Sequence, residues 1–78
     1  MSAQDIGTRV IAVASRVLGV EVSLEDSRES LAAWDSLANV DLIFSVEEEF
    51  NVKLPSELLG KLNSVGDFVE ALKNLDAS

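Results

Sequence analysis

Ser36 is the side chain of this sequence best placed to do chemistry, because its hydroxyl opens the segment "DSLANVDLIFSVEEEF" that begins at residue 35. A nucleophilic serine needs a base within hydrogen-bond reach, and that base is normally histidine. The chain has no histidine, and no basic residue falls between Arg28 and Lys53. No G-x-S-x-G pattern surrounds Ser36. We therefore expect no enzyme here, and the hydroxyl needs another explanation.

Metal binding is a second chemistry that this acidic segment suggests. A calcium loop beginning at Asp35 would need glycine at its sixth position and glutamate at its twelfth, where the chain has Val40 and Val46. The three glutamates at residues 47–49 are able to hold a divalent ion loosely, but a solvated acidic face is the favoured interpretation. The sequence therefore predicts no metal site.

Asp35 or Ser36 is expected to start a helix that ends near Phe50. Both residue types are preferred N-caps, and Asn51 tolerates the left-handed backbone that ends helices. One explanation of Ser36 is thus a helix start with no further role. In the alternative, the unpaired N–H groups and the dipole of this helix end favour an anion, so that a phosphate ester on Ser36 would be well placed.

The rest of the chain predicts the elements that position this segment. Four segments have helical periodicity, and none has convincing strand alternation. They cover about residues 3–18 and 35–50, a short helix opened by Pro55 and Ser56, and a last helix from Ser64. The linker at residues 19–34 is long, and its apolar residues should pack on the helices. The predicted fold is all-α: a small four-helix bundle with three main helices, one short helix and a long loop between helices 1 and 2.

The length and charge of the chain restrict its organisation and its partners. With 78 residues we expect a single domain over residues 1–78, and the absence of cysteine excludes disulfides. The net charge of −8 disfavours nucleic acid and anionic membranes, and it favours partners with basic patches. No signal peptide opens the sequence, and no apolar run approaches the roughly 20 residues that span a bilayer. A cytoplasmic monomer without membrane insertion is the expectation.

Three stretches of the sequence form a pattern together: "DSL" at residues 35–37, "VDLIFSVEEEF" at residues 40–50 and "LPSELLGKLNSVGDFVEAL" at residues 54–72. With this pattern the chain resembles the acyl carrier proteins, a family of phosphopantetheine-binding carrier proteins. The resemblance implies that 4′-phosphopantetheine from coenzyme A is joined to Ser36 through a phosphodiester by a separate transferase. It also implies that the thiol of this arm carries acyl groups as thioesters to enzymes of fatty acid, lipid or polyketide-type biosynthesis.

The resemblance further implies roles for two sets of side chains. One set would face basic docking patches on the phosphopantetheinyl transferase and on acyl-processing enzymes: Asp35, Leu37, Val40, Asp41, Phe44, Glu47 and Glu48. The other would line the acyl pocket or, in larger share, ordinary core: Leu42, Val46, Phe50, Leu54, Leu62, Val65 and Phe68. Charge pairs on such a docking surface mainly set the association rate and the orientation of weak complexes.

Several positions depart from the pattern of carriers in fatty acid synthesis. Trp34 precedes the DSL motif where a small residue is usual, and it is expected to pack the loop onto the bundle, with partner contact as the alternative. Ala38 stands where an acidic residue is common. Phe44 replaces a frequent methionine, and the bulky Leu59 and Phe68 predict a smaller pocket. These departures favour a specialised carrier over a housekeeping one.

Two other functions stay open. The first is a peptidyl or aminoacyl carrier, although such carriers more often have Gly-Gly-x-Ser before His or Ile and are less acidic than this chain. The second is a carrier-like helical subunit that binds a partner protein and is never modified, against which the intact DSL motif argues.

Overall fold

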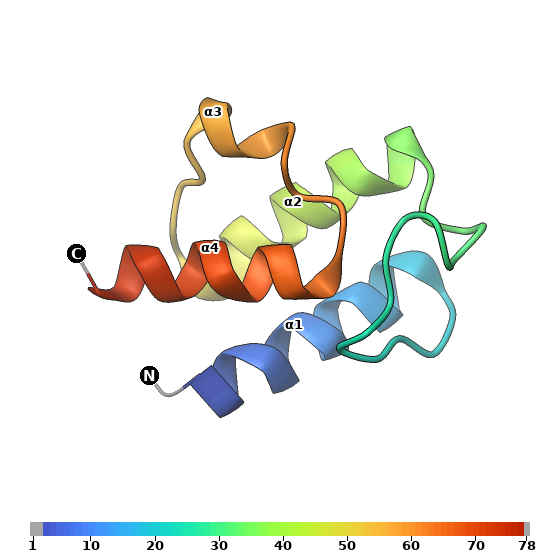
Figure 1. The fold of residues 1–78 in the computed structure, drawn as a ribbon, viewed down its shortest axis with the longest axis horizontal. Helices are drawn as coiled ribbons and strands as arrows, with labels where there is room; N and C mark the ends of the chain where they lie inside the picture. Colours follow the sequence, from blue (N-terminus) through green and yellow to red (C-terminus); the bar gives the residue numbers. More distant parts are fainter. Residues whose placement is uncertain (1–2, 78) are drawn as a thin grey trace.

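The computed structural model describes the backbone of residues 3–77 and the side chains of residues 5–75. Its helices are α1 (Ala3–Leu18), α2 (Ser36–Phe50), α3 (Ser56–Leu59) and α4 (Val65–Ala77) (Figure 1). Over these residues there is no β-strand, and the β-type pairing consists of one isolated bridge between Ser27 and Ser64. The all-α prediction, with three main helices and one short one, is confirmed.

Helix α1 forms where the apolar spacing predicts it and packs against both α2 and α4. Its inward stripe contains Ile6, Val10, Val13 and Ala14, all buried. The helix ends at Gly19, whose φ of 70° lies in the left-handed region and whose N–H donates to the Ser15 carbonyl over 2.9 Å. Glycine adopts this backbone without a steric penalty, so it terminates the helix as predicted.

Helix α2 is fixed at both ends by residues that the sequence indicates. Asp35 is the N-cap, and its carboxylate accepts the N–H of Ala38 at 2.8 Å. At the other end Asn51 is left-handed (φ 53°, ψ 49°), its N–H donates to the Glu48 carbonyl, and the N–H of Val52 donates to that of Glu47. These two bonds form a Schellman motif, which satisfies carbonyls that would otherwise lack partners.

Helix α3 and the start of α4 differ in detail from expectation. The third helix ends at Leu59, so Leu62 lies in the following turn, where its side chain is nevertheless buried. Ser64 caps α4 by accepting the Asp67 N–H at 3.1 Å. The Asp67 carboxylate accepts the N–H of Asn63 at 3.0 Å, one residue earlier than in a standard capping box.

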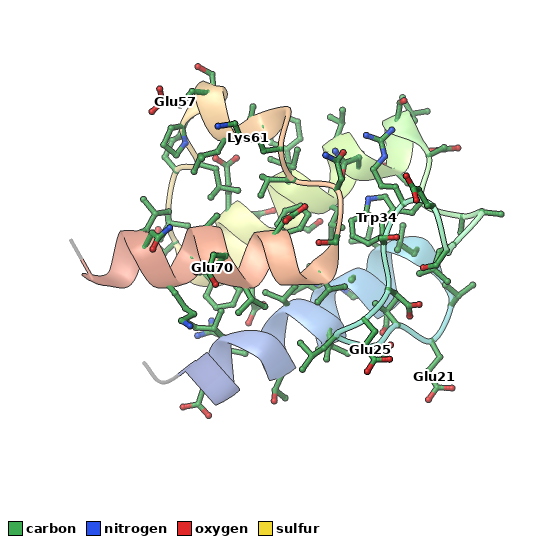
Figure 2. All side chains as sticks on the ribbon, viewed as in Figure 1. Glu21, Glu25, Trp34, Glu57, Lys61 and Glu70 are labelled. Atoms are coloured by element: carbon green, nitrogen blue, oxygen red, sulfur yellow. The ribbon has the colours of Figure 1, made fainter. Side chains whose placement is uncertain are left out.

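The long linker packs closely against the helices. Trp34 is 2% exposed, and its ring lies 6.3 Å from that of Phe68 between centroids. Figure 2 shows Trp34 pointing into the bundle, whereas Glu21 and Glu25 point outward from the same linker. Packing of the linker on the bundle is thereby confirmed. None of the helices described is long and apolar enough to cross a membrane.

Candidate functional site

Ser36 lies exposed in the first turn of α2. The Asp35 carboxylate accepts the N–H of Ala38, and the Asp35 carbonyl accepts the N–H of Asn39. Within the described part of the chain, the N–H groups of Ser36 and Leu37 have no acceptor. This helix end therefore presents the Ser36 hydroxyl together with two unsatisfied donors, an arrangement that suits an anion.

Arg28 is a charged residue in contact with this hydroxyl, and the sequence did not indicate the contact. Its Nη2 donates to Ser36 Oγ over 3.2 Å, and its Nη1 donates to Asn63 Oδ1 over 3.2 Å. A guanidinium stays protonated, so Arg28 cannot serve as the missing base. It occupies a lone pair of the hydroxyl oxygen and leaves the hydroxyl proton available to a base on another protein.

Trp34 leaves the hydroxyl accessible, although it lies two residues away. The indole Nε1–H donates to Asn39 Oδ1 over 2.8 Å, and both side chains are buried. This bond satisfies two polar groups that would be costly to bury unpaired. Of the two roles considered for Trp34, packing is confirmed, and at 2% exposure no ring surface is left for a partner. The residue also fixes the first turn of α2, and with it the position of Ser36.

The residues expected to face partners form an exposed surface on α2, with one exception. Leu37 is 77% exposed, Phe44 62% and Val40 48%, which is unusual for large apolar side chains. The acids Asp35, Asp41 and Glu48 are exposed as well. We call these six residues the α2 docking face; that they bind a partner remains a prediction.

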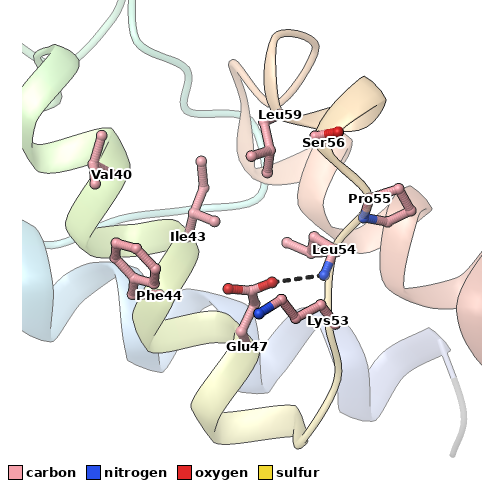
Figure 3. Close-up of a pocket in the computed structure, with 9 residues that line it drawn as sticks. All are labelled: Val40, Ile43, Phe44, Glu47, Lys53, Leu54, Pro55, Ser56 and Leu59. Atoms are coloured by element: carbon pink, nitrogen blue, oxygen red, sulfur yellow. Dashed lines mark hydrogen bonds between the residues drawn. The ribbon is translucent and has the colours of Figure 1, made fainter.

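Glu47 is the exception, because it is tied to its own chain. Its carboxylate accepts the N–H of Leu54 over 2.6 Å, and the side chain is partly buried (Figure 3). The bond connects the last turn of α2 to the segment leading into α3. Sequence reasoning placed Glu47 among the partner-facing acids, but the structure gives its carboxylate an internal role as well.

An apolar hollow of about 460 Å³ lies between α2 and α3. Its lining is Val40, Ile43, Phe44, Glu47, Lys53, Leu54, Pro55, Ser56 and Leu59 (Figure 3). Of the residues expected in the pocket or the core, only Leu54 reaches it. The others lie in the core: Leu42, Val46, Leu62, Val65 and Phe68 are buried, and Phe50 packs against them half-buried. The spacing of residues 40, 43, 44 and 47 along one side of α2 is the signal that would have indicated the hollow.

The acids at the end of α2 belong to no group of three or more potential metal ligands among residues 5–75. Glu49 instead pairs with Arg9 of α1 at 3.2 Å, and Arg9 also donates to the Glu49 carbonyl at 2.7 Å and lies over the Phe50 ring. A cation at a helix C-terminus is favourable, so α1 supplies the positive charge that α2 lacks there.

Comparison with known proteins adds an independent finding. Residues 8–72, most of the chain, match the family described as "Phosphopantetheine attachment site". The chain is also 42% identical over 53 residues to a protein of Clostridium acetobutylicum named "Acyl carrier protein". That alignment covers 68% of this chain and 69% of the relative.

Proposed function

The chain belongs to the family of proteins with a phosphopantetheine attachment site, and from this premise we propose that it is an acyl carrier protein modified on Ser36. The family is one of carriers and not of enzymes. We further propose that residues 1–78 form one carrier domain. The observation that carries the assignment of Ser36 is its exposed position at the start of α2.

Attachment of the arm needs a partner enzyme and coenzyme A. Ser36 Oγ would form a bond to the phosphorus next to the pantetheine of coenzyme A. The bond between that phosphorus and the leaving phosphate would break, releasing adenosine 3′,5′-bisphosphate. The hydroxyl proton would pass to a base on the transferase, which accounts for a serine without a base of its own.

The residues around Ser36 fit a phosphodiester. Two backbone N–H groups, those of Ser36 and Leu37, are unsatisfied, and the Arg28 guanidinium lies beside Oγ. Both features stabilise negative charge. When bound, the arm supplies a terminal thiol that holds an acyl group as a thioester, while the chain itself binds, orients and presents the arm.

The α2 docking face is proposed to meet partner enzymes. Its apolar members Leu37, Val40 and Phe44 offer contact area beside Ser36, and its acids offer attraction to basic patches. Interfaces of this kind bind weakly and are steered by charge, which suits a carrier that must leave one enzyme for the next. The proposed partners are a phosphopantetheinyl transferase and acyl-processing enzymes, met by a cytoplasmic monomer.

The hollow between α2 and α3 is proposed to shelter the acyl chain. Its lining is mostly apolar and includes the large side chains of Phe44 and Leu59. The departures from the pattern of fatty acid synthesis carriers, among them Trp34 and Ala38, support a specialised carrier for a restricted cargo over a general one. Loading with fatty-acyl and with aminoacyl substrates by their activating enzymes would distinguish this assignment from a peptidyl or aminoacyl carrier.

Intact mass measurement tests the central proposal. After incubation with a broad-specificity phosphopantetheinyl transferase and coenzyme A, the chain should gain the mass of one 4′-phosphopantetheine group. Ser36→Ala should gain none, and the matched control Ser45→Ala, on the same helix, should gain it fully. No gain in the wild type, or a gain that survives Ser36→Ala, would reject the assignment and favour an unmodified binding subunit.

A further inference from the structure

We propose that Arg28 binds the phosphodiester on Ser36 and so fixes the direction in which the arm leaves the protein. The inference rests on the proposed function, because it requires Ser36 to be the attachment point. It goes beyond that function by giving a residue outside the DSL motif a positioning role. Arg28 belongs to the long linker and lies eight positions before Ser36 in the sequence.

The geometry already brings the guanidinium to the atom that would carry the phosphorus. Arg28 Nη2 lies 3.2 Å from Ser36 Oγ. In a phosphodiester the charged oxygens are bonded to the phosphorus, which is itself bonded to Oγ, so they would lie within reach of a small side-chain adjustment. The planar fork of arginine matches two phosphate oxygens, and a charged acceptor binds it more strongly than the neutral hydroxyl does.

The charge of Arg28 is not neutralised within the protein. Its side-chain hydrogen bonds go to two neutral oxygens, Ser36 Oγ and Asn63 Oδ1. Over residues 5–75 no carboxylate lies within ion-pair distance of it. What distinguishes Arg28 is its position: in a chain with 14 acidic and 6 basic residues, it places a cation within hydrogen-bond distance of the attachment serine, where it can receive an anion.

The backbone holds Arg28 in place for this role. Its N–H donates to the Asn63 carbonyl over 2.9 Å, and the N–H of Val65 donates to the carbonyl of Asp26 over 3.1 Å. These bonds flank the bridge between Ser27 and Ser64, so the linker is clamped to the start of α4. The Arg28 side chain is half-buried, and it loses less conformational freedom on binding than a fully exposed arginine would.

A comparison of unmodified and modified protein, for the wild type and three variants, tests the proposal. Wild type, Arg28→Gln and Arg28→Lys are each prepared with and without the arm. Arg16→Gln serves as the control, because it removes the same charge from an exposed position on α1. Circular dichroism of the unmodified forms verifies that each variant is folded.

The first measurement is the ³¹P resonance of the phosphodiester in folded and in urea-unfolded protein. In the wild type and in Arg16→Gln the two resonances should differ, and in Arg28→Gln most of that difference should disappear. Arg28→Lys should be intermediate, because lysine keeps the charge and loses the fork. Identical resonances in wild type and Arg28→Gln would overturn the proposal.

The second measurement is the change in Tm caused by the arm. The Tm shift caused by the arm should be about 2–4 °C more positive in the wild type than in Arg28→Gln. This coupling should shrink at about 1 M salt, where charge interactions are screened within about 3 Å. Equal changes in both proteins would contradict the role of Arg28. Modification of Ser36 in every variant, with no coupling, would reject this inference alone, whereas no modification at all would reject the proposed function.

Discussion

The two segments that flank α2 are ordered by different means. The linker at residues 19–34 is long and is held by contacts with residues distant in sequence, including the bridge from Ser27 to Ser64 and the packing of Trp34 on Phe68. The connection at residues 51–55 is short and is held by α2 itself, through the turn at Asn51 and the bond from Leu54 to Glu47. Length alone therefore does not decide which of the two is well ordered.

The comparison shows that the attachment serine depends on distant residues. Ser36 is positioned by a linker that must first dock on α4, whereas the hollow between α2 and α3 is bounded by a local turn. A change in the linker should therefore disturb the attachment site and the fold together. A change in the short connection should disturb the hollow with a smaller loss of stability.

Removing Trp34 should have the largest effect. Trp34→Ala should lower the free energy of unfolding by about 3–5 kcal/mol, because it leaves a cavity in the core and an unpaired Asn39 amide. Trp34→Phe, which keeps an aromatic ring but is smaller and lacks the indole N–H, should cost about 1–3 kcal/mol. Urea denaturation measures both.

Leu37→Ala is the control for this prediction, since Leu37 lies close in sequence and is 77% exposed. Its unfolding free energy should stay within about 0.5 kcal/mol of the wild type. A Trp34→Ala protein as stable as Leu37→Ala would show that the linker is not anchored by the indole.

Removing the Glu47 carboxylate should have an intermediate effect. Glu47→Gln replaces a charged acceptor of the Leu54 N–H by a neutral one and should cost about 1 kcal/mol, discounted for partial exposure. Glu48→Gln, one residue along and exposed, should cost nearly nothing. Urea denaturation compares the two, and equal stabilities would mean that the bond across the short connection is not made in solution.

The Asp26 turn inside the linker should give the smallest effect, visible in its pH dependence. The Ser23 N–H bonded to its carboxylate at 2.8 Å lowers the pKa of Asp26, with smaller lowering by the Ser30 and Ser23 hydroxyls, and desolvation opposes them. A lowered pKa stabilises the fold above the unfolded pKa of about 4, and this contribution is lost as the pH falls through the folded value.

Asp26→Asn should therefore lower the Tm at pH 7 by only about 1 °C. The difference in Tm between wild type and Asp26→Asn should narrow as the pH falls below about 4. Thermal unfolding at several pH values measures this difference in Tm, and a difference that widens in acid would contradict the assigned direction of the pKa shift.

The parts of the fold that the sequence predicted are those governed by local signals. The apolar spacing of residues 6–18 predicts α1, Asp35 and Asn51 bound α2, and Trp34 was expected to pack. Each of these depends on a few neighbouring residues, because capping and helical periodicity act within one or two turns. The expected start of α4 at Ser64 was likewise correct to one residue.

The parts that escaped prediction depend on residues far apart in sequence. Arg28 meets Asn63 across 35 positions, and that contact is what brings its guanidinium to Ser36. No local pattern encodes such a pair, since it exists only after the linker has docked. The sequence showed only that no basic residue lies between Arg28 and Lys53, and spacing along the chain does not indicate that the Arg28 side chain returns to Ser36.

The two bonds of Glu47 have a consequence for mapping the docking face by charge reversal. Its carbonyl accepts the Val52 N–H in the turn that ends α2, while its carboxylate accepts that of Leu54. A lysine at this position would put an ammonium where the Leu54 donor needs an acceptor, and the wall of the hollow would shift. A loss of carrier activity in such a variant could come from a deformed carrier as readily as from lost partner binding. Charge-reversal variants at Asp41 and Glu48 therefore test the docking face more directly.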